Sequence, residues 1–507
     1  MNIFLKILTY LYLVYFLGLL IVLIMLIKHS FFAFRKLFKG LRLKNHFILF
    51  VLVLLGFLFR IKYSFHIDLD PYGWRYIQDS LAIKGIFYPS LSLHFQLSDA
   101  LHVLGYSFFA FIPLLFSNNI FAVSVFNIGF SVLTIVVVYL ITYLWTQNKS
   151  ASALAAGMLT ASLLHIVYSG MEFPMSISVF FVALEFLYFI LWLRSKNIIF
   201  GLVSLAAFFI SINIKFENIV FILLYGLVSI TSLKDVILKE QFKRFWKYFT
   251  AIFAFSVLIW IPFIINFQYL QVKSVPPSQH LYSLGNFWEH FWLFVVEKYR
   301  GFPLFMVLAF FVLNFFKKST FKGYVLTGWF FVSLLLFSWC AAINSEWNML
   351  QILIPTFIIS GYVISETVIL FFKNKTSKYI ILFLVLFILF WNAMSSVKEV
   401  KRYSWVNLKE DLDSAVDEGC IISLDIRTSK FSLNFLFPDR NWIFLENNYQ
   451  NNDFSQCKDK LYYFNPVPYG LEEEADKKAV LRREDRLREK YEFEKVSKFA
   501  LYTLKKE

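Results

Sequence analysis

The sequence has 507 residues, of which 59% are hydrophobic and only 16% charged, with a mean hydropathy of +0.62. Soluble domains carry about 25% charged residues, so this composition excludes a soluble globular protein and predicts a polytopic α-helical membrane protein. The net charge of +15 does not indicate nucleic-acid binding, because most Lys and Arg residues lie in short links between apolar runs, where they orient membrane spans.

Twelve apolar runs predict membrane helices, because the hydrocarbon core of a bilayer needs about 20 apolar residues per helix. The runs lie near residues 3–27, 46–62, 119–145, 151–168, 175–193, 197–213, 217–232, 248–269, 302–316, 324–342, 349–372 and 379–396. Every second link between them is basic. By the positive-inside rule these links face the cytoplasm, which places both termini and the remaining links outside the plasma membrane.

The first outer loop spans residues 63–118 and is long enough to carry function. Its apolar run 101–116 contains Gly105 and Pro113. If this run crossed the membrane, every later basic link would move outside. We therefore predict an interfacial or re-entrant helix here.

Three regions are predicted along the chain. Residues 1–45 form an extra membrane helix and a basic cytoplasmic link; the helix has no cleavage site and is expected to be retained. Residues 46–404 form the main membrane domain, which includes the first outer loop. Residues 405–507 form a small extracytoplasmic α/β domain, with strands at 420–426, 442–445, 460–464 and 499–504 and helices at 408–416 and 471–490.

Three cysteines are too few for a disulfide framework or a zinc cluster. Cys420 and Cys457 both lie in the C-terminal region, where they could pair if that region is extracytoplasmic. The sequence contains no glycine-rich phosphate loop, metal-spaced His/Cys cluster or nucleophile elbow.

The main functional candidates are acidic residues at predicted outer membrane edges. Asp68 and Asp70 follow the second apolar run, and Glu172 follows the fourth. Acidic residues at such edges are costly unless they are solvated, paired or bound to a cation, so they indicate a functional site. The alternative is that the two aspartates only cap a helix beginning near Pro71. The same segment continues with Tyr72, Arg75 and Tyr76.

Cationic candidates occupy other outer links. Loop 270–301 mixes aromatic residues with His280, Lys298 and Arg300, which suits a lipid with an anionic head group. The alternative is an interfacial aromatic belt with snorkelling cations. Lys215 lies in a short outer link, where it could bind phosphate or pair with Glu217. His165 is expected to be a packing histidine rather than a catalytic one.

The order of these parts resembles the GT-C superfamily of membrane glycosyltransferases, which use polyprenyl-phosphate-linked sugars. The superfamily includes protein O-mannosyltransferases, the lipid A aminoarabinose transferase and oligosaccharyltransferases. The resemblance covers most of the chain and is carried by segments 70–76 (DPYGWRY), 85–89 (GIFYP), 164–172 (LHIVYSGME), 212–217 (INIKFE) and 347–355 (WNMLQILIP).

The sequence also departs from the superfamily pattern. Asn348 and Met349 stand where Arg-Tyr is common, which weakens the case for a phosphate or sugar contact there. The first loop has some features of oligosaccharyltransferases. However, the Trp-Trp-Asp acceptor motif is absent, which argues against transfer to Asn sequons.

The resemblance implies an inverting glycosyltransferase that moves a sugar from a polyprenyl-phosphate donor to a hydroxyl of a lipid, glycan or protein acceptor at the outer membrane face. Asp70 would accept the acceptor's proton as general base. Glu172 would orient the acceptor or share a magnesium or manganese ion with Asp70; no other cofactor is expected. The candidates for binding substrate or phosphate are Tyr72, Arg75, Tyr76, Lys215, His280, Lys298 and Arg300.

Two other classes of function remain open. A secondary transporter or lipid flippase would also have about twelve spans, but it would tend to show two related halves with ionisable residues at the midplane. Here the acidic candidates lie at span ends on one side. A non-catalytic assembly subunit, with the terminal domain as a docking platform, is the third hypothesis.

Overall fold

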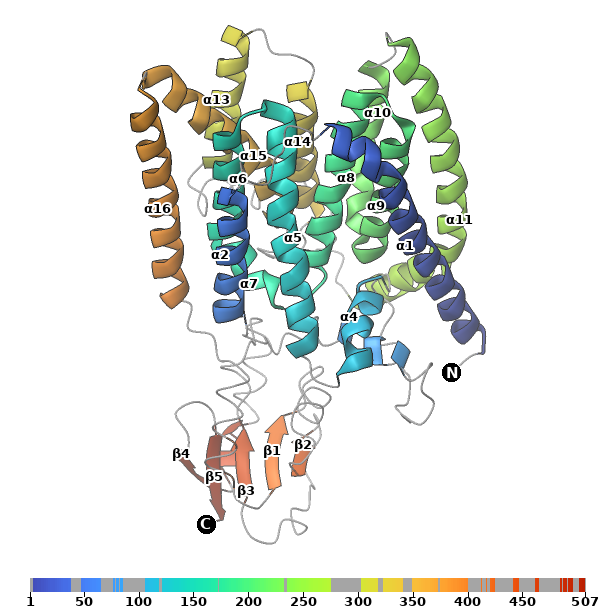
Figure 1. Cartoon of the computed structure of the whole chain (residues 1–507). Coiled ribbons are helices and arrows are strands. Elements are labelled where there is room, and N and C mark those ends of the chain that lie inside the picture. The colour runs from blue at the N-terminus through green and yellow to red at the C-terminus, as the bar shows by residue number, and fades with distance from the viewer. Residues whose placement is uncertain are drawn as a thin grey trace.

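The computed structural model contains a bundle of helices with a small β-sheet beyond one end (Figure 1). The structure describes residues 3–37, 47–64, 76–77, 79–81, 83–84, 105–117, 121–171, 173–231, 235–274, 302–317, 322–340, 349–372, 374–399, 412, 416, 420–424, 441–445, 461–464, 484–485, 487–489, 491–495 and 501–506.

Helices lie in all twelve predicted apolar runs. They are α1 Ile3–Leu37, α2 Phe47–Ser64, α5 Phe121–Thr146, α6 Lys149–Ala161, α7 Leu163–Ser169, α8 Met175–Ser195, α9 Ile198–Ile214, η2 Phe216–Phe221, α10 Ile222–Thr231, α11 Val236–Ser274, α13 Phe302–Lys317, α14 Lys322–Cys340, α15 Met349–Phe371 and α16 Lys375–Glu399. Among the described residues, four helices are long and apolar enough to cross a membrane, or five if the bent pair α6–α7 is one span. The helical membrane class is confirmed, and the count of twelve spans stays a prediction.

The run in the first outer loop forms a short helix, α4 Gly105–Phe116, of 12 residues. At 1.5 Å per residue it is about 18 Å long, less than the hydrocarbon core of about 30 Å. It packs on α5 and α9. A Cβ at Gly105 would lie only 2.2 Å from the Asn213 carbonyl oxygen, so glycine permits the close approach of α4 to the end of α9.

The expectation for residues 233–247 needs correction. We predicted a basic link there, followed by a span from 248. Instead, helix α11 begins at Val236 and runs without a break for 39 residues. Hydrophobic residues at Leu238, Phe242, Phe245 and Phe249 recur every three or four positions and are buried, so this segment gains a packed face that stabilises it as helix.

Small residues set the spacing at the centre of the bundle, where α6 packs on α15. A Cβ at Gly361 would lie 2.6 Å from the Ala151 carbonyl oxygen and 2.9 Å from the Ala155 backbone nitrogen. Between membrane helices, packing of small residues replaces the hydrophobic driving force available in water. The small residues of α6 therefore let α15 approach closely at Gly361.

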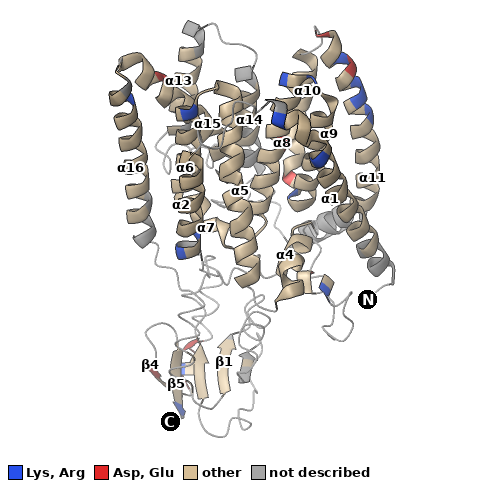
Figure 2. Cartoon of the chain, viewed as in Figure 1, with Lys and Arg blue, Asp and Glu red and all other residues tan. Residues whose placement is uncertain are grey.

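The two ends of the bundle differ in charge. Lys and Arg recur at the helix ends farthest from the sheet, including those of α11 and α16 (Figure 2). The cations of the predicted basic links that the structure describes therefore lie toward one end of the bundle. By the positive-inside rule this end is expected to face the cytoplasm, with the sheet on the opposite side.

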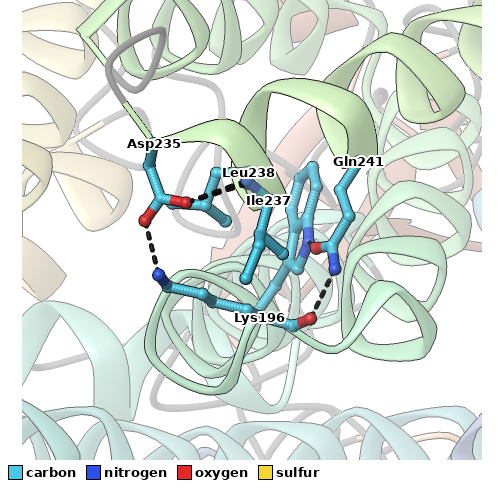
Figure 3. Close-up of polar contacts among 6 residues, drawn as sticks. Lys196, Asp235, Ile237, Leu238 and Gln241 are labelled. Carbon is cyan, nitrogen blue, oxygen red and sulfur yellow. Dashed lines mark hydrogen bonds and ion pairs between the residues drawn. The ribbon is translucent and has the colours of Figure 1, made fainter.

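At the basic end, polar contacts tie the α8–α9 link to the start of α11. Lys196 Nζ lies 2.5 Å from an oxygen of Asp235 (Figure 3). Asp235 also accepts hydrogen bonds from the backbone nitrogens of Ile237 and Leu238, which caps α11. Gln241 Nε2 donates to the Lys196 carbonyl oxygen. The pKa of the Asp235 carboxyl is lower than usual, mainly because of the hydrogen bond from Lys196.

The sheet has the strand order β2-β1-β3-β5-β4. Its strands are β1 Cys420–Leu424, β2 Asn441–Leu445, β3 Leu461–Phe464, β4 Tyr491–Lys495 and β5 Leu501–Lys506. β1 pairs in parallel with β2 and β3, and β5 is antiparallel to β3 and β4. Strands β1, β2, β3 and β5 overlap the segments predicted as strands, whereas β4 was missed. Cys420 is disulfide-bonded; Cys457, with which it could pair, lies outside the described residues.

Candidate functional site

The end of the bundle nearest the sheet brings the first outer loop against the turn between α7 and α8. Tyr76 is 5% exposed. Its ring makes edge-to-face contacts with Tyr106 of α4, at 5.0 Å between centroids, and with Phe173, at 5.9 Å. Such aromatic pairs contribute beyond the area that they bury. Tyr76 follows Asp70 by six positions and Phe173 directly follows Glu172, so the contact joins segments beside both acidic candidates.

A side chain of α5 fixes the same turn. Asn127 Nδ2 donates to the Met171 carbonyl oxygen at 2.6 Å and lies 2.9 Å from the Tyr106 hydroxyl. Asn127 is fully buried, and its own side-chain oxygen makes no hydrogen bond within the described part of the chain. One amide therefore connects α4, α5 and the residue before Glu172.

Two polar side chains hold the described part of the first loop on α4. Ser80 Oγ lies 2.6 Å from the Tyr76 carbonyl oxygen and 2.8 Å from that of Ser107. Lys84 Nζ donates to the Leu114 carbonyl oxygen at 2.6 Å, near the end of α4. A cation near a helix C-terminus is favoured by the helix dipole. These contacts hold residues that follow Tyr76 in the sequence against α4 and so help to position Tyr76.

Lys215 lies at the same end, as the C-cap of α9. It is 9% exposed, and its Nζ is 3.4 Å from Met175 Sδ. Met175 begins α8, three residues after Glu172. The structure thus places the Lys215 ammonium beside the segment that carries the second acidic candidate. A buried ammonium near this turn is suited to holding an anionic group.

Next to Lys215, amide side chains connect α8, η2 and α15. Asn218 Nδ2 donates to Ser178 Oγ at 2.9 Å and to the Ser211 carbonyl oxygen at 3.0 Å. Gln351 Nε2 lies 3.2 Å from the same Ser178 oxygen. The side-chain oxygens of Asn218 and Gln351 make no hydrogen bond to the described residues. These acceptors were not among our candidates, although Gln351 lies in the segment 347–355 that carries the resemblance.

A buried arginine was also missed. Arg60 of α2 is fully buried and donates from Nε to Ser131 Oγ at 2.7 Å and from Nη1 to the Gly56 carbonyl oxygen at 2.9 Å. Its Nη2 lies 2.5 Å from His165 Nδ1 and 3.4 Å from the Leu159 carbonyl oxygen. His165 is thus buried and hydrogen-bonded, as expected for a packing histidine. The signal for Arg60 was an arginine inside an apolar run, which is costly unless it is paired.

Arg60 sits where α6 ends and α7 begins. The two helices are bent by 57° at this break, and Ser162 Oγ accepts from the His165 backbone nitrogen to cap α7. The last turn of α6 leaves carbonyl oxygens without partners inside the helix. The Leu159 carbonyl oxygen accepts from the Ser162 backbone nitrogen at 3.3 Å, and Arg60 Nη2 adds a second donor at 3.4 Å, so Arg60 helps to stabilise the break that leads to the Glu172 turn.

The sequence also contains a buried acid that we did not select. Glu185, in the middle of α8, is fully buried. It interacts electrostatically with Tyr225, whose hydroxyl lies 2.6 Å from Ser204 Oγ. No hydrogen bond of standard geometry reaches its carboxylate oxygens from the described residues. Glu185 thus differs from the acidic candidates that we selected, which all lie at predicted span ends.

Of the predicted site residues, Tyr76 and Lys215 lie within the described residues, and both lie at the sheet-facing end of the bundle. The others lie outside the described residues: Asp68, Asp70, Tyr72, Arg75, Glu172, His280, Lys298 and Arg300. Among the described residues, no group of three or more His, Cys, Asp or Glu could hold a metal ion. The cation that Asp70 and Glu172 would share stays a prediction.

The architecture matches solved structures of a known enzyme. ArnT from Cupriavidus metallidurans in the apo state superposes with a TM-score of 0.55 and 9% sequence identity, covering 91% of this chain and 97% of that one. The same protein bound to undecaprenyl phosphate gives a TM-score of 0.51 with the same identity and coverage. No family model and no curated protein matches the sequence. Most of this chain therefore has a fold similar to that of ArnT, in agreement with the membrane fold that the sequence resemblance implies.

Proposed function

We propose that this protein is a membrane glycosyltransferase that moves a sugar from a polyprenyl-phosphate donor to a hydroxyl of a lipid, glycan or protein acceptor. The observation that carries the proposal is the Tyr76–Phe173 contact, which joins the segments beside Asp70 and Glu172. The GT-C-like fold supports it, and so does a bound undecaprenyl phosphate in one of the similar structures.

The reaction needs a base for the acceptor and charge neutralisation for the leaving phosphate. The acceptor hydroxyl oxygen attacks the anomeric carbon of the sugar, while the bond from that carbon to the phosphate oxygen breaks. The hydroxyl proton passes to the Asp70 carboxylate, and polyprenyl phosphate leaves with the bonding electron pair. One displacement of this kind inverts the anomeric configuration. Glu172 orients the acceptor or shares a magnesium or manganese ion with Asp70.

Lys215 is our candidate for the leaving phosphate. Its buried ammonium lies at the end of α9 and approaches the start of α8. In a site shielded from water, a fixed positive charge stabilises developing negative charge more strongly than it does in bulk solvent. Arg75, Lys298 and Arg300 are further candidates on the same side of the predicted topology, with Tyr72, Tyr76 and His280 available to contact the sugar or the acceptor.

The reaction is proposed to take place on the extracytoplasmic face of the plasma membrane. The sheet lies at the bundle end opposite the basic helix termini (Figure 2). The disulfide at Cys420 supports the same orientation, because disulfides persist in oxidising compartments outside the cytosol. A donor carried on a lipid fits this face, where a polyprenyl-linked sugar is held in the membrane beside the site.

The test is an incubation of purified protein with lipid extracts that contain polyprenyl-phosphate sugars. We expect mass spectrometry to detect free polyprenyl phosphate and a glycosylated product in equal amounts. A matched control uses Lys149→Gln, at the opposite end of the bundle, which should react as the wild type does. Lys215→Gln should lower the rate of polyprenyl phosphate release. Transport of intact lipid-linked sugar without any release would contradict the proposal and favour a flippase.

A further inference from the structure

Helix α11 begins at the basic end of the bundle (Figure 2). Its first three turns therefore lie on the side of the bundle opposite the candidate site.

One face of these turns is fixed against the bundle. Phe242 and Phe245 lie with ring centroids 4.5 Å and 5.0 Å from Trp192 of α8. Phe249 packs 5.5 Å from Phe209 of α9. The buried aromatic face fixes the rotation of α11 about its axis, so the opposite face is held outward.

That outward face is a basic stripe formed by Lys239, Lys243, Arg244 and Lys247. All four side chains are exposed. The three lysines are spaced by four residues, which places them one above another on the helix surface. The four cations make no ion pair with the described residues, and Glu240 is the one acid within the stripe. Four cations and one acid give the stripe a net charge of +3.

The neighbouring residues place the stripe at the level of lipid head groups. Trp246 is partly buried and donates from Nε1 to Ser229 Oγ at 3.0 Å, and Tyr248 is 50% exposed. Trp and Tyr collect at the membrane interface, where their polar groups meet water and their rings meet lipid. Past Tyr248 the exposed residues Phe255 and Leu258 are apolar. The cations thus begin beside Tyr248, at Lys247, and reach about two and a half turns from it, at Lys239.

We propose that the basic stripe of α11 binds anionic phospholipid head groups of the membrane leaflet opposite the candidate site. The stripe faces outward on a helix whose opposite face is packed, lies beside Trp246 and Tyr248, and carries a net positive charge. Clusters of four or more cations on an amphipathic segment beside a span are suited to anionic lipid. An acidic soluble protein would not require the stripe to lie beside the aromatic interface, so lipid is the better match.

The test uses native mass spectrometry of the full chain in neutral detergent, with phosphatidylglycerol or phosphatidylcholine of equal acyl length added. The wild type should bind phosphatidylglycerol more tightly than phosphatidylcholine. Each cation near an anionic surface contributes about fivefold, so K239Q/K243Q/K247Q should weaken phosphatidylglycerol binding about a hundredfold. Raising the ionic strength should reduce the wild-type preference, because salt screens exposed charges.

The matched control is K28Q/R35Q/K149Q. It removes three exposed charges from the same end of the bundle, but those charges do not form one stripe. The control should keep the wild-type lipid preference, and both triple variants should keep wild-type helix content by circular dichroism. Equal loss in both variants would mean that overall charge decides binding and would overturn the proposal. Unchanged binding in K239Q/K243Q/K247Q would overturn it as well and leave the stripe to an acidic protein or to solvent.

Discussion

Replacement of Asn127 by leucine tests whether the Glu172 turn is held by α5. Leucine has a similar volume but cannot donate to the Met171 carbonyl oxygen or interact with the Tyr106 hydroxyl. Each hydrogen bond contributes about 1 kcal/mol net, so the loss is about 2 kcal/mol. If these two hydrogen bonds hold the turn in its active position, the fraction of protein molecules with the turn in that position falls about 30-fold.

The assay for Asn127→Leu combines unfolding in denaturing detergent with the initial rate of polyprenyl phosphate release. Thr134→Val is the matched control on the same helix, because it removes a hydrogen bond from Oγ1 to the Phe130 carbonyl oxygen and none to the turn. The free energy of unfolding of Thr134→Val should fall by less than about 1 kcal/mol, and its rate of polyprenyl phosphate release should equal that of the wild type. Equal rates in Asn127→Leu and Thr134→Val would refute the reasoning.

Three further predictions follow from single contacts. Gly361→Val should lower the thermal unfolding temperature strongly, because its Cβ would lie 2.6 Å from the Ala151 carbonyl oxygen and force α6 and α15 apart. Arg60→Gln should destabilise by roughly 2 kcal/mol in detergent unfolding, because several buried acceptors lose a donor. The pKa of Asp235 is lower in the folded protein than in the unfolded chain, so its carboxylate stabilises the fold above about pH 4, the pKa of the unfolded chain. This stabilisation is lost as the pH falls through the folded-state pKa. The free energy of unfolding measured below pH 4 should show the loss in wild type and not in Asp235→Asn.

Hydropathy located the helices because a bilayer imposes a length and an apolar composition on each span. The same method failed where a helix begins with a charged segment, at the start of α11. Residues 236–247 contain several cations and were assigned to a link, but their apolar residues recur with helical spacing and pack on α8 and α9. The helical spacing of the apolar residues was the signal that could have identified residues 236–247 as helix, since charged residues on the outward face are compatible with a helix.

The break between α6 and α7 shows a different limit. A single span at 151–168 was expected, but Ser162 caps a new helix and Arg60 donates a second hydrogen bond to the Leu159 carbonyl oxygen at the break. A serine before an apolar run is a weak start signal, and the partner that stabilises the bend lies about a hundred residues earlier in the sequence. Tertiary contacts of this kind cannot be read from local pattern.

For the candidate site, the sequence indicated which end of the bundle matters. Tyr76 and Lys215 were selected from their positions beside predicted outer edges, and both lie at the sheet-facing end. Asn127 and Gln351 were not selected, because an amide inside an apolar run gives no sign of its partners. The contact between Tyr76 and Phe173 joins segments almost a hundred residues apart and could be found only in the folded chain.

The most direct test of the central claim compares Asp70→Asn with Asp68→Asn in the transfer assay. Asparagine keeps the size and the helix-capping ability of aspartate but cannot accept the acceptor's proton. We expect Asp70→Asn to insert and fold normally while polyprenyl phosphate release falls by about 10²-fold or more, and Asp68→Asn to be milder. Wild-type release by a folded Asp70→Asn protein would contradict the assignment of Asp70 as the general base.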